Sequence, residues 1–225
     1  MTFSLVGRCV RTGMLGAIVT SSSPAVAARC AWARAGVGAV CTQNVTDPTL
    51  GTALLDRLEM GLSPDDALAA VIAEAAHIEH RQLTAVDRAG RSAAFSGKNT
   101  LGRFATRVDT NCAAAGNLLA DEGVPLAMAA AFSSDPSGHL GDRMIAALEA
   151  GRDAGGEEGP IHSAGMLVVE TVAWPVTDLR VDWTDGDPVE ELAGLWHLWR
   201  PQADAYVARA LDPAGAPSYG VPGDA

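Results

Sequence analysis

The chain opens with short apolar runs bounded by glycine, a pattern that predicts strands rather than helices. Residues 2–8 and 16–21 are both brief and rich in β-forming side chains, and a turn at Thr12-Gly13 separates them, so we expect a hairpin. A third run, 35–43, contains two glycines, which would weaken a helix and allow another backbone to approach closely. We interpret this run as a buried strand.

Helical spacing of apolar residues follows, over 50–61 and 67–76. The second of these helices begins after Ser63, which can cap it, with Pro64 suited to the first helical position and Asp66 facing the free amides of the first turn. Two consecutive helices are therefore expected after the first three strands.

The rest of the chain alternates strands and helices in the same way. The expected elements are a hairpin of 82–87 and 91–96, a strand near 110–118, helices at about 123–133 and 139–151, a loop at 151–160, strands at 165–172 and 178–183, and a helix from 187 to about 209. Strands in consecutive hairpins favour antiparallel sheets with helices on their outer faces, which predicts an α+β layered sandwich. We expect a single domain over residues 1–209 and a Pro/Gly-rich tail over 210–225.

Composition and charge narrow the possible partners. The 225 residues are 48% hydrophobic and 19% charged, as in a folded globular protein. Sixteen Lys and Arg against 27 Asp and Glu give a net charge of −11, the wrong sign for neutralising phosphates, so nucleic acid is not an expected partner. Cys9, Cys30, Cys41 and Cys112 include no CxxC pair, which fits a reducing cytoplasm. No apolar run approaches the roughly 18–20 residues that cross a bilayer, so no membrane span is expected.

The amino terminus leaves a secreted protein open as an alternative. Arg8 and Arg11 precede an apolar stretch at 14–20, and residues 25–27 (Ala-Val-Ala) resemble the small-residue site at which signal peptides are cut. The mature chain would then begin near Ala28. Because the apolar stretch is at the lower limit of length for such a signal, a cytoplasmic location is our expectation.

Several local patterns resemble cofactor or metal sites but lack a required part. Residues 36–41 begin like a dinucleotide fingerprint, yet Cys41 stands where the third glycine is needed. Glu74, His77, Glu79 and His80 lie on neighbouring helical turns as metal ligands would, but no further ligand cluster converges with them by sequence. We therefore expect neither a metal nor a cofactor.

Two pairs of adjacent acids, Asp65-Asp66 and Glu157-Glu158, are further candidates for catalysis. Neighbouring side chains diverge, so such a pair cannot flank one scissile bond as two catalytic carboxylates do. We expect both pairs to be solvated.

Thr2 carries the most specific chemistry in the sequence. A small residue after Met1 is the usual condition for removal of the initiator methionine, which would leave a hydroxyl and a free α-amine on one residue. An α-amine has a pKa of roughly 7.7–8.0, against about 10.4 for lysine, so it is a ready base at neutral pH. A threonine activated by its own amine is a recognised nucleophile. Thr2 is therefore the candidate catalytic residue.

Six stretches of the chain carry a family resemblance. They are MTFSLVGR, AVAARCAWARAGVGAVCTQ, RQLTAVDRAGRSAAFSG, AGNLLA, ALEAGRDAGG and DLRVDWTDGDPVEEL, in this order, from residue 1 to about 200. Together they resemble the bacterial domain-of-unknown-function family 1028, assigned to the N-terminal nucleophile (Ntn) hydrolase superfamily. The resemblance implies a four-layer αββα sandwich with the nucleophile at the end of the first strand. It also implies hydrolysis of an amide or related C–N bond of a small molecule through an acyl-threonine ester.

The resemblance also suggests four further site residues. Ser21 and Ser22 end the second strand, which places them near the amine of Thr2 as hydrogen-bond partners. Arg34 is a candidate cation for stabilising the neutral amine or for holding a substrate carboxylate, and Asn117 is a candidate oxyanion donor.

The chain departs from the family pattern at three places. It reads SSSP where the family commonly has a lysine-containing SK segment, Ala115 where a glutamine precedes the Gly-Asn pair, and residues 159–162 (Gly-Pro-Ile-His) where an Arg-Gly-Gln run is common. We therefore expect the substrate-contacting residues to differ. A non-catalytic protein that uses the sandwich for binding or assembly is the alternative function, and the acidic, tryptophan-bearing last helix makes a homodimer the expected assembly.

Overall fold

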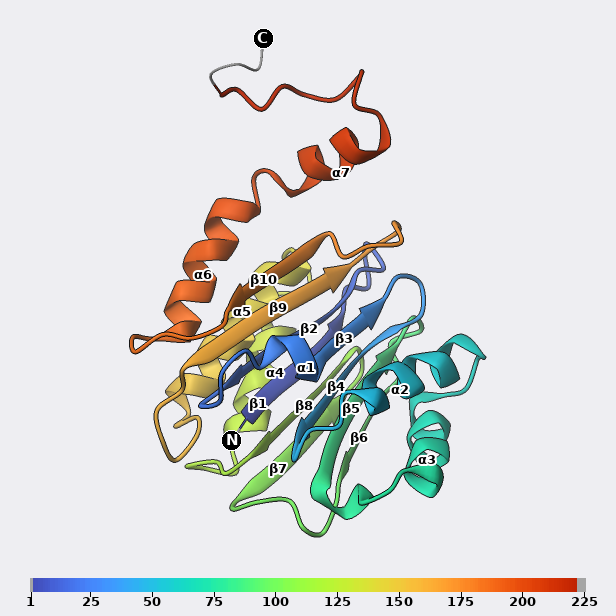
Figure 1. The fold of residues 1–225 in the computed structure, drawn as a ribbon, viewed down its shortest axis with the longest axis vertical. Helices are drawn as coiled ribbons and strands as arrows, with labels where there is room; N and C mark the ends of the chain where they lie inside the picture. Colours follow the sequence, from blue (N-terminus) through green and yellow to red (C-terminus); the bar gives the residue numbers. More distant parts are fainter. Residues whose placement is uncertain (1, 222–225) are drawn as a thin grey trace.

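The computed structural model describes residues 2–221, in which two antiparallel sheets lie face to face (Figure 1). The larger sheet has the strand order β10-β9-β2-β1-β8-β7, and the smaller has the order β3-β4-β5-β6. The strands are β1 (Thr2–Arg8), β2 (Leu15–Ser21), β3 (Ala31–Arg34), β4 (Gly38–Asn44), β5 (Arg81–Asp87), β6 (Ser92–Ser96), β7 (Phe104–Asp109), β8 (Cys112–Asn117), β9 (Ser163–Val169) and β10 (Thr177–Val181).

Helices cover the outer face of each sheet and complete four layers (Figure 1). The helices are α1 (Ala27–Cys30), α2 (Thr49–Glu59), α3 (Pro64–Glu74), the short 3₁₀ helix η1 (Ile78–His80), α4 (Val124–Ser134), α5 (Leu140–Asp153), α6 (Pro188–Trp199) and α7 (Ala203–Leu211). α2 and α3 pack on the smaller sheet, and α4 and α5 pack on the larger one. The predicted αββα sandwich is thereby confirmed. Within residues 2–221, no helix has both the length and the apolar character needed to cross a bilayer.

Three apolar cores separate these layers, and β1 contributes to two of them. Phe3 and Leu5 belong to the core beneath α4 and α5, whereas Val6 belongs to the core between the sheets. Because side chains alternate along a strand, Thr2 and Ser4 face the inter-sheet space as Val6 does. Both are buried, at 4% and 0% exposure. The start of β1 therefore brings polar side chains into the space between the two sheets.

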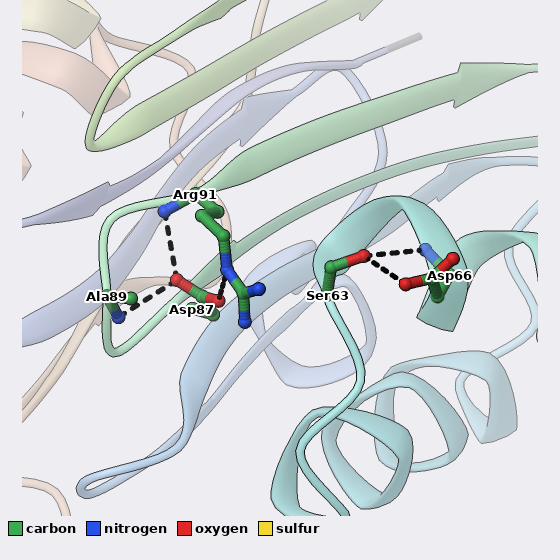
Figure 2. A network of polar contacts seen from close by, with 5 residues as sticks. All are labelled: Ser63, Asp66, Asp87, Ala89 and Arg91. Carbon is green, nitrogen blue, oxygen red and sulfur yellow. Dashed lines mark hydrogen bonds and ion pairs between the residues drawn. The ribbon is translucent and has the colours of Figure 1, made fainter.

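Local sequence signals account for several element ends. Ser63 Oγ accepts the backbone N–H of Asp66 at 3.2 Å and donates to its carboxylate at 2.6 Å, so α3 begins with the expected cap (Figure 2). The turn between β5 and β6 is closed by the buried Asp87, which accepts the N–H groups of Ala89 and Arg91 at 2.9 Å each (Figure 2). The Arg91 guanidinium pairs with the same carboxylate at 2.6 Å.

The prediction was wrong at three places. The run 35–43 forms β4 only from its fourth residue, because a turn closed by Val37 N–H and the Arg34 carbonyl precedes it, and β3 lies before that turn. β7 was missed because most of its residues are exposed and it lacks apolar alternation. The helix expected over 187–209 is two helices, α6 and α7, because Pro201 between them has no N–H to continue the ladder.

We predict that Gly141→Ala, at the start of α5, lowers the free energy of unfolding by about 1–3 kcal/mol. A Cβ at this position would lie 2.4 Å from the indole ring of Trp196, which is buried and held by a hydrogen bond to Asp142. Gly194→Ala on α6 is the matched control, because nothing lies within 4 Å of its Cβ, and we expect a gain of up to about 1 kcal/mol from helix propensity. Urea titration measures both, and equal shifts in the two variants would contradict the packing argument.

Candidate active site

Thr2 begins β1, the strand that lies between β2 and β8 in the larger sheet. Its Oγ1 donates to Ser21 Oγ at 3.3 Å, and its backbone is paired with that of Asn117 on β8. The end of β2 and the end of β8 therefore flank the Thr2 side chain. Of the residues predicted for the site, the structure brings Thr2, Ser21 and Asn117 together.

A short chain of hydrogen bonds fixes Ser21 from the other side. Ser21 Oγ accepts the backbone N–H of Ser23 at 3.1 Å and lies 2.8 Å from Ser23 Oγ. Arg29 on α1 donates to Ser23 Oγ at 2.8 Å, and Ser163 Oγ donates to the Ser23 carbonyl at 2.6 Å. The loop after β2 is thus tied to α1 and β9, which holds the acceptor of the Thr2 hydroxyl in place.

Glu157 is a member of this cluster that sequence reasoning missed. The residue was expected to be solvated, but it is 6% exposed, and its segment forms an isolated bridge with Leu119, just after β8. The backbone N–H of Ser22 donates to Glu157 Oε2 at 3.3 Å. Its second oxygen, Oε1, is buried and has no hydrogen-bond partner among residues 2–221.

The environment of Glu157 disfavours its charged form. Burial raises the pKa of its carboxyl to about 7, against which the charge of the chain's amino terminus and hydrogen bonds from Ser22 act. A carboxyl group of this kind exchanges a proton near neutral pH, which is the range in which an acid or base at an active site operates. Ser22, which was predicted for the site, donates its hydrogen bond to Glu157 and so belongs to the cluster through that carboxylate.

A network of buried amides lies between the two sheets next to Thr2. Ser4 Oγ donates to Gln43 Oε1 at 2.6 Å, and Gln43 Nε2 donates to Gln82 Oε1 at 2.8 Å. Asn117 Nδ2 donates to the same Gln82 oxygen at 3.1 Å, while Gln82 Nε2 donates to the Gly116 carbonyl at 3.0 Å. All four side chains are at most 1% exposed. The network therefore joins β1 and β8 of one sheet to β4 and β5 of the other.

The Gly116 carbonyl sets the direction of every bond in this network. A carbonyl only accepts, so the Gln82 atom facing it must be the nitrogen, and Gln82 Oε1 then faces Gln43 and Asn117. Asn117 must consequently turn its nitrogen toward Gln82. Its Oδ1 is buried and has no partner in the part of the chain that the structure describes. Asn117 thus offers the site an acceptor oxygen and one remaining N–H.

Arg34 is not brought into the cluster. It pairs with Gly38 at the beginning of β4, whereas the inter-sheet network contacts Gln43 near the end of that strand. Its guanidinium binds the carboxylates of Asp56 and Glu59 on α2, at 2.9 and 2.5 Å. The topological argument that suggested Arg34 placed it at the wrong end of the strand pair.

No metal site accompanies the cluster within the described residues, where no group of three or more His, Cys, Asp or Glu is arranged to hold an ion. Three of the side chains considered for a metal have other partners: Glu74 pairs with Arg57 at 2.8 Å, Glu79 Oε2 accepts the backbone N–H of Lys98 at 2.9 Å, and His80 Nε2 lies 3.2 Å from Asn99 Nδ2.

Comparisons with known proteins identify relatives of the whole sandwich. The family described as "Family of unknown function (DUF1028)" matches residues 2–192. The crystal structure of protein SPO2555 from Silicibacter pomeroyi, assigned to DUF1028, has a TM-score of 0.82 at 29% identity over 88% of this chain and 85% of that chain.

Two Anbu structures are also similar, at lower scores. Anbu (ancestral beta-subunit) from Yersinia bercovieri has a TM-score of 0.41 at 9% identity, over 96% of this chain and 99% of that chain. The Anbu (Gly-1) mutant from Hyphomicrobium sp. strain MC1 has a TM-score of 0.43 at 10% identity, over 92% and 99%. No curated protein matches the chain.

We predict that Gln82→Met destabilises the fold by about 3 kcal/mol, because N–H groups of Gln43 and Asn117 and the Gly116 carbonyl would stay buried without their partner. Gln202→Met is the matched control, since this glutamine is exposed, and a change within about 0.5 kcal/mol is expected. Chemical denaturation of the two variants tests the network, and it would be refuted by similar free energies of unfolding.

Proposed function

Because the chain belongs to the family of unknown function DUF1028, which includes a crystal structure of the same fold, we propose that its site is that of an N-terminal nucleophile amidohydrolase. Removal of Met1 frees the α-amine of Thr2, and Thr2 then cleaves an amide or related C–N bond of a small molecule. The observation that carries the proposal is the buried Thr2 hydroxyl at the start of a central strand, hydrogen-bonded to Ser21.

The reaction needs only the groups of Thr2, the substrate and water. The Thr2 hydroxyl gives its proton to the α-amine while Oγ1 adds to the carbonyl carbon of the substrate. Collapse of the tetrahedral adduct breaks the C–N bond, and the α-ammonium returns the proton to the leaving nitrogen. Water then adds to the acyl-threonine ester through the same base, and the C–O bond breaks as Oγ1 regains its proton. The net reaction adds one water across the C–N bond.

The neighbouring groups take supporting roles in this proposal. Ser21 orients the Thr2 hydroxyl, because its own oxygen is held by Ser23. The remaining N–H of Asn117 is the candidate donor for the oxyanion of the tetrahedral adduct, and Ser22 holds Glu157. Arg34 has no role in the proposal because it is paired with α2.

The architecture supports the assignment to the Ntn superfamily. A nucleophile on the first strand of two stacked antiparallel sheets, with helices on both outer faces, is the arrangement that the family resemblance implies, and this chain has those layers. Once Met1 is removed, the first residue of β1 is also the first residue of the chain, so a side-chain hydroxyl and a terminal amine come from the same residue.

We predict that Thr2→Ala folds but loses all turnover on a panel of activated amides, whereas Thr2→Ser retains part of it, because only serine keeps a hydroxyl beside the amine. Intact mass should show loss of Met1 and, after reaction with a β-lactone, one acyl group on residue 2. Thr106→Ala is the control, since Thr106 is exposed on β7, and it should behave as the parent. Retention of Met1 in active protein, or parental turnover by Thr2→Ala, would place catalysis elsewhere and favour the non-catalytic reading of Thr2.

A further inference from the structure

We propose that Glu157 is a positioning residue for the nucleophile: its Oε1, together with Asn117 Oδ1, accepts hydrogen bonds from the α-amino group of Thr2 and holds that group beside the Thr2 hydroxyl. This inference rests on the proposed function in one respect, which is that Thr2 becomes the first residue of the chain. It adds an acidic residue to a site for which the sequence predicted none.

Glu157 is held from two sides at the end of β1. The bridge to Leu119 attaches its backbone to the segment that follows Asn117, the partner of Thr2. Its carboxylate accepts the N–H of Ser22, which follows the serine bonded to the Thr2 hydroxyl. Both anchors lie just beyond the ends of strands that flank β1, so the carboxylate is held near the end at which Thr2 lies.

Two buried acceptors at this end lack donors. Glu157 Oε1 and Asn117 Oδ1 have no hydrogen-bond partner among the described residues, and the direction of the amide network prevents Asn117 from exchanging its oxygen for its nitrogen. A buried acceptor without a partner costs free energy, more so when it is charged. A free α-amino group has up to three N–H donors, enough for both oxygens and one further contact. Before Met1 is removed, the nitrogen of Thr2 is a peptide nitrogen with a single N–H, which cannot serve both oxygens.

Two arginines contact the residues next to Ser22 and Glu157, and both have other partners. Arg29 donates to Ser23 Oγ and to the carbonyls before α1, and Arg103 pairs with Glu158 at 3.2 Å. Neither arginine contacts the carboxylate, and the positive charge that acts on Glu157 is that of the chain's amino terminus. Once Met1 is removed, that charge is the α-ammonium of Thr2, the cation that Glu157 is placed to receive.

A carboxylate beside the amine has two effects on the reaction. It favours the ammonium form and so opposes the loss of basicity that burial alone would cause, which keeps the amine a competent proton acceptor. It also fixes the direction of the nitrogen lone pair relative to Oγ1, because two of the N–H bonds are committed to fixed oxygens.

The test is a titration of the mature protein by carbon NMR with labelled threonine, in which the Thr2 resonances are assigned by their absence from Thr2→Ser. We expect the α-amine to titrate about one pH unit lower in Glu157→Gln than in the parent, because the neighbouring negative charge is lost. Glu157→Asp should restore part of the shift. Glu158→Gln is the matched control, because its carboxylate is half-exposed and paired with Arg103, and it should titrate as the parent does.

A second measurement tests the same contact through the reactivity of Thr2. The rate at which a β-lactone acylates Thr2 should fall roughly 10- to 100-fold in Glu157→Gln and be unchanged in Glu158→Gln, as expected for a base that has lost its orientation. An unchanged amine titration in a folded Glu157→Gln protein overturns the inference, and a slower acylation in that case means that the carboxylate contacts the lactone. If the titration shifts while Thr2→Ala still turns over amides, the contact stands and the proposed function fails. Retention of Met1 overturns both.

Discussion

The burial of β1 on both faces is the constraint from which the site follows. This strand lies in the middle of the larger sheet, with helices on one side and the smaller sheet on the other, so each of its polar side chains must find a partner inside the protein. Thr2 and Ser4 meet that requirement through Ser21 and Gln43. The polar side chains at one end of the otherwise apolar space between the two sheets are thus a consequence of the central position of β1.

The same constraint gives the amide network a single arrangement. An isolated pair of buried glutamines could exchange their oxygens and nitrogens at little cost, but Gln82 also faces the Gly116 carbonyl, which cannot donate. That one acceptor determines the orientation of Gln82, then of Gln43 and of Asn117. These directed hydrogen bonds make the packing of the two sheets specific at the end where Thr2 lies, and they leave Asn117 Oδ1 without a partner among the described residues.

The parts of the fold that could be predicted from sequence are those in which local pattern and burial agree. The first hairpin is apolar and its turn is short, and α3 has a cap, a proline and an acid in consecutive positions. β7 could not be predicted, because an exposed edge strand has no apolar face to produce alternation. Thr2 was accessible to reasoning from its own chemistry, since hydroxyl and amine share one residue. The position of Arg34 relative to Thr2 could not be predicted in this way, because it depends on which end of the antiparallel pair β3–β4 lies next to the start of β1.

The place of Glu157 in the site could not be predicted from the sequence, for a reason that the structure makes clear. The observation that adjacent acidic side chains diverge was sound, but in an extended segment divergence sends one of them inward and the other outward. Here Gly155 and Gly156, both with positive φ, turn the chain so that the next residue bridges Leu119. Glu157 then points into the space beside β1, and Glu158 reaches Arg103 at the surface. The sequence of two acids after two glycines therefore does not predict which carboxylate is buried. That depends on the strand to which the segment attaches.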